Sequence, residues 1–492
     1  MDTLNYNTLE KSGYDGFILK SAPVRVLQFG EGNFLRCFVD YFIDIANEKA
    51  GFNSKVTIVQ PVPFGNLEPV FNKQQGLYTM YLRGFENGSV TDEKRIISAI
   101  DSYINPYSDF GGFLKAAENP ELRYIVSNTT EAGIAYDSSC RFEDAPPSSF
   151  PAKLTRFLHK RWSVKGRGLV ILSCELIDDN GAKLREIVER YVNDWQLEAE
   201  FLSWLCSECQ FCSTLVDRIV TGYPADEADK LCSENGYIDG LLDVGESFAL
   251  WVIEGSEELR QELPFERAGL PVKVVKDHSP YKRQKVRILN GAHTSMVYAA
   301  YLCGRDFVRE SVLDDDIGPF LKSVIYDEIL PVEGLALSET TDFAASVLER
   351  FQNPFTHHKL LSIAMNATSK WSARVLPSIK DYAAREKKLP KGLTFSLAAC
   401  ISFLHAASLH DGKPYGSRED GEYEIQEDTA VLSFIADNLD ADAVEFGRRI
   451  LVKSEFWGED LTALPGLADT VTVYLEDIRK NGMREALRRV NG

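Results

Sequence analysis

The chain has 492 residues, of which 44% are hydrophobic and 26% are charged, so it is a globular protein too long for one ordinary core. Its formal net charge of −19 excludes nucleic acid as a partner, because phosphate binding requires a basic surface. The first 20 residues are polar, and the longest apolar run, 393–409, is interrupted by serines and a histidine. We therefore predict a cytoplasmic protein with no export signal, no membrane partner and reduced cysteines.

The first half of the chain alternates strand patterns with helix patterns. An apolar run at 24–29 predicts a buried strand, a Gly-Glu-Gly turn follows it, and residues 34–46 have helical spacing. Further strands are predicted at 55–60, 77–83, 89–97, 124–127 and 168–174, and helices at 110–117, 151–162 and 182–195. This alternation predicts an α/β, Rossmann-like N-terminal domain with a mostly parallel sheet, to which runs at 248–253 and 272–275 add strands.

The pattern changes near residue 278. Strand patterns give way to amphipathic or apolar helical runs at 286–302, 317–329, 341–351 and 393–409. Residues 412–427 are rich in glycine and charge and predict a surface loop. We therefore predict a dinucleotide-binding domain over residues 1–278 and a mostly α-helical C-terminal substrate domain over residues 279–492.

Gly30 and Gly32 form the turn after the first strand. In a first β-α turn, glycines let the backbone approach a pyrophosphate, and the next helix offers free N–H groups. Leu35 replaces the third glycine of the usual fingerprint, so the turn alone also fits a bend without a ligand. Its place after the first strand favours a dinucleotide, with Gly30, Gly32, Asn33 and Phe34 as cofactor-binding candidates.

Two later strand ends add cofactor-binding candidates. The second strand ends at Gln60, where related sheets carry an acid that holds the ribose 2′-hydroxyl. Gln60 can hydrogen-bond a ribose without repelling a 2′-phosphate, so this residue leaves NAD and NADP open. Asn128 and Thr130 follow the strand at 124–127, at the edge where open α/β sheets bind ligands. The alternative for these two residues is a loop that caps a helix.

Lys285, Asn290 and His293 form the strongest catalytic constellation. At about 100° per residue, Asn290 lies about 140° and His293 about 80° around the helix from Lys285. A buried lysine can pass a proton to a carbonyl oxygen as hydride arrives at carbon, and an amide can hold that oxygen. A histidine can orient a substrate hydroxyl. The alternative is a helix with an exposed lysine and a core histidine.

Cationic groups gather near residue 360. His358, Lys370 and Arg374 are candidates to bind a substrate carboxylate, although each also fits a solvated helix face. The run Cys206-x2-Cys209-x2-Cys212 raises the alternative of a metal site, but a fourth ligand at suitable spacing is missing. We therefore predict no metal.

The Lys285-x4-Asn290-x2-His293 spacing resembles the signature of the polyol-specific long-chain dehydrogenases, the mannitol dehydrogenase family. Five blocks carry the same resemblance: QFGEGNFLR at 28–36, SNTTEAGI at 127–134, CELID at 174–178, FCSTLVDRIVTGYP at 211–224 and ILNGAHT at 288–294. The resemblance implies reversible reduction of a keto-uronic acid with NAD as the cofactor. It makes Lys285 the general acid and base, Asn290 the group that polarises the carbonyl, and His293 and Asp217 substrate contacts.

One position departs from the family pattern. Other members have Cys-Asp-Asn where this chain has Cys174-Glu175-Leu176, so Leu176 removes one amide donor to the reacting oxygen. That contact is left to Asn290 or Asn128. The predicted partner is a small sugar acid, and the chain is expected to be a monomer or a small homo-oligomer. Two alternatives stay open: a reductase of an isomeric keto-uronic acid, and a nucleotide-binding sensor without catalysis.

Overall fold

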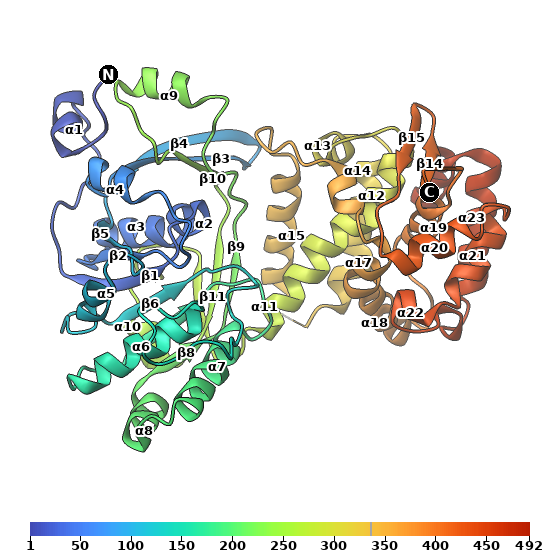
Figure 1. Ribbon diagram of the computed structural model, residues 1–492. Coiled ribbons are helices and arrows are strands. Elements are labelled where there is room, and N and C mark those ends of the chain that lie inside the picture. The colour runs from blue at the N-terminus through green and yellow to red at the C-terminus, as the bar shows by residue number, and fades with distance from the viewer. Residues whose placement is uncertain (335–336) are drawn as a thin grey trace. The chain divides into compact units, whose positions relative to one another are not determined.

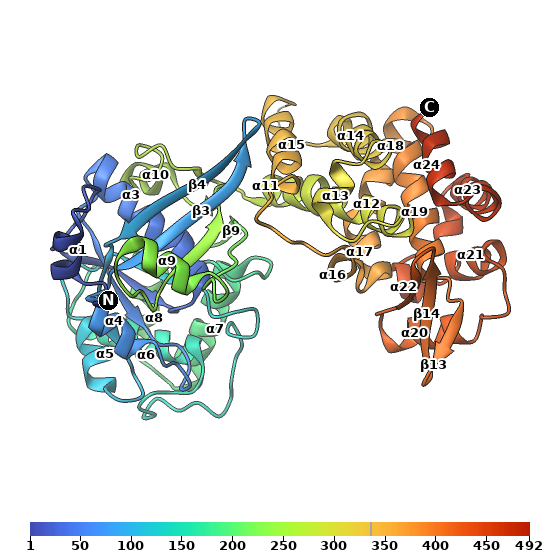
Figure 2. The ribbon, with the colours of Figure 1, turned by 90° about the horizontal axis from the view of Figure 1, so that it is seen from above.

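The computed structural model describes residues 1–334 and 337–492, and the chain divides into two compact units. The first comprises Met1–Arg83 and Thr91–His278, and the second comprises Gly84–Val90 and Ser279–Gly492. Each unit has its own set of helices and strands (Figures 1 and 2) and its own buried apolar residues.

The main sheet of the first unit has six parallel strands in the order β5-β2-β1-β6-β7-β8. The strands are β1 (Val24–Phe29), β2 (Lys55–Val59), β5 (Ile100–Ile104), β6 (Tyr124–Ser127), β7 (Val170–Ser173) and β8 (Gln210–Cys212). Counted along the chain within this sheet, the order is 3-2-1-4-5-6, the Rossmann arrangement. The predicted Rossmann-like fold is therefore confirmed. The strand order reverses between β1 and β6, which is where such sheets bind ligands.

Helices cover both faces of this sheet (Figure 1). The helical segments of the first unit are α1 (Tyr6–Ser12), α2 (Asn33–Leu35), η1 (Arg36–Asp40), α3 (Tyr41–Ala50), α4 (Glu68–Gln74), α5 (Phe110–Ala116), α6 (Phe150–Ser163), α7 (Asn180–Asp194), α8 (Ala199–Glu208), α9 (Ala228–Asn235) and α10 (Glu257–Glu262). Successive residues of β1 point to opposite faces, so Val26 and Leu27 belong to two different apolar clusters. Because β1 is buried on both faces, its sequence is a nearly continuous run of apolar residues.

Two expected additions to the main sheet lie elsewhere. The runs at 248–253 and 272–275 do form β11 (Leu250–Glu254) and β12 (Val272–Val275), but they belong to a separate sheet, in which β11 lies between β12 and β9 (Thr214–Asp217). The prediction that they extend the main sheet is wrong. Trp251 of β11 is fully buried and packs on Phe38 and Phe42, with ring centroids 5.7 and 6.3 Å apart. The apolar pattern of β11 therefore reflects its burial against η1 and α3, which carry Phe38 and Phe42.

The strands predicted at 77–83 and 89–97 form a hairpin, and a third strand lies beside it. β3 (Tyr78–Glu86) and β4 (Ser89–Ile97) turn at Asn87 and Gly88, both with positive φ. β10 (Asp243–Glu246) pairs with β3 in parallel, which completes a sheet of order β10-β3-β4.

The second unit is mostly helical (Figure 2). Its helical segments are α11 (Ser279–Gln284), η2 (Lys285–Asn290), α12 (Gly291–Leu302), α13 (Val308–Val312), α14 (Ile317–Ser323), η3 (Val324–Ile329), η4 (Leu330–Val332), α15 (Leu337–Phe351), α16 (Leu360–Ala364), α17 (Ala367–Arg374), α18 (Leu376–Glu386), α19 (Lys391–Leu404), α20 (Thr429–Ala436), α21 (Ala443–Leu451), α22 (Ser454–Trp457), η5 (Leu461–Ala463), α23 (Leu467–Asn481) and α24 (Met483–Asn491). α12 and α19 are almost entirely buried, which explains why their apolar residues occur on all sides.

A small sheet occupies most of the surface loop that the sequence predicts at residues 412–427. It consists of β13 (Ser408–His410), β14 (Lys413–Arg418) and β15 (Gly421–Glu424), paired antiparallel. Its inner face is supplied by few side chains, chiefly Tyr423, whose ring stacks on Phe403 at 4.7 Å. Because its other residues are mostly polar or glycine, their composition resembled that of a loop. The described residues include no helix long and apolar enough to cross a bilayer.

Candidate functional site

The glycine turn at the end of β1 requires glycine at its first position. Gly30 has a φ of 131° and donates its N–H to the Val59 carbonyl at 3.2 Å. A Cβ at Gly30 would lie 3.0 Å from Leu35 Cδ1 and 3.2 Å from the Asn128 carbonyl oxygen. The chain at Gly30 therefore passes tightly between α2 and the residue that follows β6.

Gly32 has a different role, because the space beside it is open. It is the N-cap of α2 with a φ of −69°, and a Cβ there would meet nothing within 4 Å. Its carbonyl accepts the Arg36 N–H at 3.3 Å, so the helix starts immediately after it. An open helix N-terminus at the strand-order reversal is the geometry that receives a pyrophosphate. The backbone at Gly32 thus fits the predicted dinucleotide.

The side chains that follow Gly32 are held in place by the protein. Asn33 Oδ1 accepts a hydrogen bond from the Arg36 guanidinium, and Phe34 stacks on Phe38 with ring centroids 5.1 Å apart. Gly222 passes so close to Asn33 that a Cβ there would lie 2.1 Å from Asn33 Nδ2. Asn33 and Phe34 are therefore ordered parts of the turn.

Gln28 and Asp40 support the turn from inside the core. Gln28 Nε2 donates to the Gly30 carbonyl and to Asp40 Oδ2, both at 3.2 Å. Both residues are fully buried, and burial raises the pKa of Asp40 to about 7 against a favourable Gln28 hydrogen bond and the Arg36 charge. A carboxyl group with a pKa of about 7 is therefore linked to the candidate cofactor turn through one side chain, that of Gln28.

Gln60 is committed to the loop after β2. Its side chain is 1% exposed, its Nε2 donates to the Val62 carbonyl at 2.7 Å, and its Oε1 accepts the Tyr103 hydroxyl at 3.0 Å. Gly65 packs on the same amide, since a Cβ there would lie 2.4 Å from Gln60 Cδ. In this arrangement Gln60 shapes the loop that would face the ribose.

A buried glutamate organises the segment that contains Asn128 and Thr130. Glu175 Oε1 accepts the Thr129 N–H at 3.0 Å, and its Oε2 accepts the Ser127 hydroxyl at 3.2 Å. Burial raises the pKa of Glu175. Asn128 Nδ2 donates to the Cys174 carbonyl at 2.9 Å, while Thr130 is exposed with a φ of 67°. In the sequence, Glu175 is recognised only as part of the motif at 174–178. Its supporting role could have been suspected from its place just after the buried strand β7.

Leu176 and Asp217 differ in exposure. Leu176, which stands where related chains have an asparagine, is 65% exposed. Asp217 ends β9 and is 5% exposed. The next residue, Arg218, fixes this strand end by donating to the Cys37 carbonyl at 2.6 Å and the Phe248 carbonyl at 3.1 Å.

In the second unit, Lys285 and Asn290 are the first and last residues of a π-helical segment, η2. The Gly291 N–H reaches back to the Val286 carbonyl, five residues earlier, as π geometry requires. In an α-helix residues five apart point about 140° away from each other, whereas i→i+5 bonding makes them neighbours on successive turns. The predicted helix is thus present with a wider turn, which places Lys285 and Asn290 on one side. Both are half-buried.

His293, one turn further along, packs between aromatic rings. Its ring stacks on Phe351 at 4.0 Å and 16°, and meets His358 edge-on at 5.3 Å. Its Nε2 is buried without a hydrogen-bond partner among the described residues. Burial lowers the pKa of His293 well below its usual range, and the charges of His358, Arg350 and Arg374 lower it further. His293 is therefore a neutral imidazole with one nitrogen available to a ligand.

The structure brings three of the predicted substrate-binding groups together around His293. Burial lowers the pKa of His358, and Lys370 lowers it further. Burial and Arg374 likewise lower the pKa of Lys370. Arg374 donates to Thr294 Oγ1 at 3.3 Å. The close approach of α17 to α12 explains this grouping, since a Cβ on Gly291 would lie 3.1 Å from the Arg374 carbonyl oxygen. Groups of one sign that are buried together, with perturbed pKa values, are typical of functional sites.

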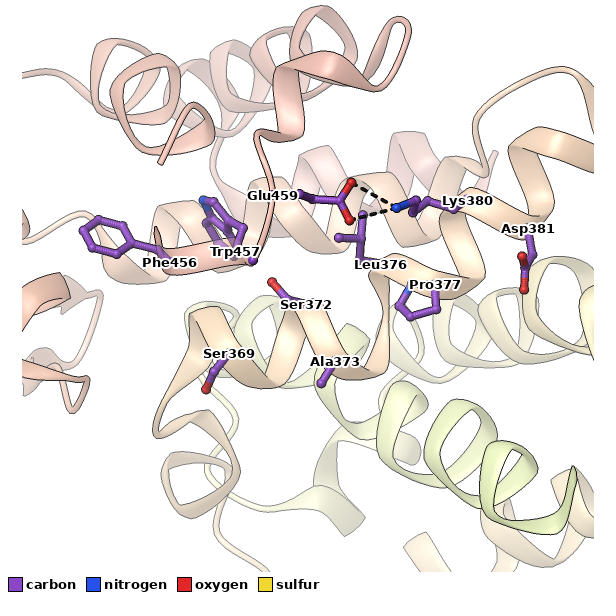
Figure 3. Close-up of a pocket in the computed structure, with 11 residues that line it drawn as sticks. Ser369, Ser372, Ala373, Leu376, Pro377, Lys380, Asp381, Phe456, Trp457 and Glu459 are labelled. Carbon is purple, nitrogen blue, oxygen red and sulfur yellow. Dashed lines mark hydrogen bonds and ion pairs between the residues drawn. The ribbon is translucent and has the colours of Figure 1, made fainter. Parts of the chain in front are cut away.

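A pocket of about 580 Å³, drawn in Figure 3, has none of these four residues in its lining. It is lined by Ser369, Ser372 and Ala373 of α17, rather than by Lys370 or Arg374. Lys380 and Glu459 form an ion pair at 2.8 Å within it. Lys380, the cation among its lining residues, is already paired with Glu459, and Asp381 adds a further acid, so we do not assign the substrate to this pocket.

The cysteine run does not form a metal site within the part of the chain that the structure describes. Cys206 is exposed, whereas Cys209 and Cys212 are buried, and burial raises the pKa of both to about 12. Thiols this hard to deprotonate are poor ligands. All nine cysteines are free thiols.

The fold and the two clusters define a class of protein. A model of the mannitol dehydrogenase Rossmann domain matches residues 24–267, and one of the mannitol dehydrogenase C-terminal domain matches residues 277–479. The chain belongs to the mannitol dehydrogenase family.

Particular relatives narrow the comparison. The altronate oxidoreductase of Yersinia enterocolitica is 44% identical over 485 residues, covering 98% of this chain and 99% of the relative. Among solved structures, substrate-free D-sorbitol dehydrogenase has a TM-score of 0.80 at 23% identity, covering 99% of this chain and 100% of that one. Pseudomonas fluorescens mannitol 2-dehydrogenase, in a ternary complex with NAD and D-mannitol, has a TM-score of 0.67 at 21% identity, with 99% of both chains covered. These two structures support the fold.

Proposed function

We propose that this protein is an NAD-dependent altronate oxidoreductase, which reversibly reduces D-tagaturonate to D-altronate in galacturonate breakdown. One observation carries the proposal: the helix with Lys285, Asn290 and His293 faces a cationic group formed by His358, Lys370 and Arg374. A neutral polyol needs no such charges, whereas a sugar acid does. The full-length similarity to altronate oxidoreductases supports the same substrate.

The first unit would hold the cofactor. The tight turn at Gly30 and the open N-terminus at Gly32 fit a pyrophosphate, with Asn33 and Phe34 beside it and Asn128 and Thr130 at the next strand end. The loop anchored by Gln60 would face the ribose. When bound, NADH supplies the hydride. The choice of NAD over NADP follows from the family and from the NAD complex of the mannitol enzyme.

The second unit would supply the proton chemistry. In reduction, the Lys285 ammonium gives a proton to the carbonyl oxygen of the sugar acid and becomes a neutral amine; in oxidation it takes that proton back. The Asn290 amide donates a hydrogen bond to the same oxygen as charge develops on it. Neutral His293 binds a neighbouring hydroxyl, and Lys370 and Arg374 bind the carboxylate. Asp217 is proposed as a further substrate contact.

Side-by-side assays test the reaction and the substrate. Loss of NADH, and separately of NADPH, is followed by absorbance with tagaturonate, fructuronate and fructose. We expect fast NADH oxidation with tagaturonate and poor turnover of fructose, which lacks the carboxylate. Fast turnover of fructuronate instead would make the protein a mannonate oxidoreductase. Equal turnover of fructose would contradict the role of the cationic group.

Replacement of Lys285 tests the mechanism. We expect Lys285→Ala to lower kcat by at least a hundredfold, in line with the effect of a general acid, and to leave NADH affinity within about twofold. Lys285→Arg is the matched control, because it keeps the positive charge but holds its proton too tightly to transfer it. A Lys285→Ala enzyme with a near-normal rate would favour the non-catalytic sensor.

A further inference from the structure

Helix α17 carries two like charges toward the proposed substrate site. Lys370 and Arg374 lie one helical turn apart, and such pairs destabilise an isolated helix. Lys370 Nζ donates to the Ile363 carbonyl at 3.0 Å, and Arg374 donates to Thr294 Oγ1 at 3.3 Å. Neither partner carries a negative charge, so these contacts orient the cations without neutralising them.

The start of α17 is capped by a residue from a distant segment. The N-cap residue Asn366 has a φ of 53° and makes no side-chain cap. Instead, Glu427 Oε1 accepts the Thr368 N–H at 2.8 Å, and Glu427 Oε2 accepts the Thr368 hydroxyl at 3.4 Å. The preceding carbonyl, that of Gln426, accepts the Asn366 N–H at 3.0 Å. A carboxylate at a helix N-terminus accepts hydrogen bonds from free N–H groups and interacts favourably with the positive end of the helix dipole.

The same carboxylate acts on Lys370 through space. The groups that face Lys370 are Arg374 on its own helix, His358 from the segment before α16, and Glu427. Burial and Arg374 lower the pKa of Lys370, whereas Glu427 raises it. Burial raises the pKa of Glu427 itself, against its hydrogen bonds from Thr368. Glu427 is thus the negative group that opposes loss of the Lys370 proton.

We propose that Glu427 is a positioning residue for the sugar-acid site: it fixes the start of α17 and keeps Lys370 charged toward the substrate carboxylate. This inference rests on the proposed function. It assigns a role to the segment after β15, which contacts the start of α17 through the hydrogen bonds of Gln426 and Glu427. Glu427 acts through Lys370 and is not itself a substrate contact.

Two substitutions separate the charge of Glu427 from its cap. Glu427→Gln keeps an oxygen that can accept the Thr368 N–H but removes the charge, whereas Glu427→Ala removes both. We expect Glu427→Gln to raise KM for tagaturonate about tenfold, with kcat changed less than about threefold and Tm nearly unchanged. KM for fructose should not change. Glu427→Ala should show the same rise in KM together with a lower Tm, because the cap is lost.

The pH profile gives the most specific readout. Lys370 binds a carboxylate only while protonated, so affinity for the acid falls as pH rises through its pKa. Without Glu427 this pKa is lower, and the fall in kcat/KM for tagaturonate should begin at lower pH in Glu427→Gln. Glu424→Gln is the control, since Glu424 pairs with Lys413 on the surface at 2.7 Å.

Each outcome decides the inference. An unchanged KM and pH profile in Glu427→Gln would overturn it. Equal losses with tagaturonate and fructose, together with a lowered Tm in both variants, would show a purely structural role and also overturn it. A wild-type enzyme that reduces fructose but neither keto-uronic acid would instead overturn the proposed function. That result is distinguishable because it appears before any substitution is made.

Discussion

Gly30 and Gly32 are two residues apart but constrain different things. Gly30 has a φ of 131° and a Cβ there would press on Leu35 and the Asn128 backbone, whereas Gly32 has an ordinary φ and open space beside it. We expect Gly30→Ala to lower Tm, since the strained φ alone costs about 1 kcal/mol or more. Gly32→Ala should leave Tm within a few degrees but weaken NADH binding at least tenfold, because its methyl group would occupy the pyrophosphate space.

Thermal melts and NADH fluorescence titrations of both variants check this pair. The two glycines serve as controls for each other. If Gly32→Ala bound NADH normally, the pyrophosphate would not approach the backbone at this turn.

Asp40 makes stability depend on pH. It is fully buried, and its pKa rises from 3.8 to about 7 on folding. The neutral form is the stable one in the core, so its contribution is complete below pH 4 and is lost as pH rises through 7. At about 1.4 kcal/mol per pKa unit, ionisation costs on the order of 4 kcal/mol.

Urea unfolding at pH 5 and pH 8 tests this effect. Asp40→Asn should narrow the difference in the free energy of unfolding between the two pH values, because the amide stays neutral. The exposed Asp226→Asn is the control and should leave the difference unchanged. Asp243 is also buried with a pKa of about 7, so part of the pH dependence should remain. A wild-type protein equally stable at both pH values would contradict the argument.

At the scale of elements, the contact between α12 and α17 places Arg374, one cation of the proposed substrate site. Thr294 is 1% exposed, and its hydroxyl accepts a hydrogen bond from Arg374. Thr294→Val keeps the shape and removes that bond, which is worth about 1 kcal/mol. We therefore expect KM for tagaturonate to rise about fivefold, with kcat and NADH affinity unchanged.

The adjacent Ser295 supplies the control for this prediction. It is fully buried, and its hydroxyl has no partner among the described residues, so Ser295→Ala should leave KM unchanged. A comparable rise in KM in both variants would mean that α12 packing, rather than the Thr294–Arg374 bond, sets substrate affinity.

The same scale shows what the sequence could predict. Lys285, Asn290 and His293 could be proposed from the sequence because their spacing is local, and the π turn changes only how they face one another. The sequence shows that Lys285 and Asn290 are five positions apart, but nothing in the residues of η2 distinguishes this π-helical segment from an α-helix. Glu175 and Glu427 act on partners 46 and 59 residues away, so their roles depend on tertiary structure that no local pattern reports.

At the scale of the whole molecule, the alternation of strands and helices was sufficient to predict the Rossmann-like sheet. β2, β6 and β7 are buried along their whole length, so each gives a strong signal. β5 and β8, at the two edges of the sheet, are partly exposed and were not predicted. The assignment of β11 and β12 failed because burial reveals that a strand is covered but not which sheet it joins. The sheet at 408–424 failed for the opposite reason, since its strands are short and largely exposed.

The overall charge leads to a prediction about salt. A net charge of −19 repels an anionic substrate over long distances, while the cationic group around His293 attracts it at contact. The Debye length is about 30 Å at 0.01 M salt and about 8 Å at 0.15 M, and partly buried contacts are screened less than exposed charges. Added salt should therefore remove the repulsion before it weakens the contact.

We expect kcat/KM for tagaturonate to rise between 0.01 and 0.15 M salt, measured with saturating NADH so that cofactor binding does not limit the rate. Fructose is the control, because a neutral substrate feels neither field. A steady fall for tagaturonate would mean that the local cations outweigh the acidic surface at every distance. In that case the excess of acidic residues would affect solubility but not the encounter with substrate.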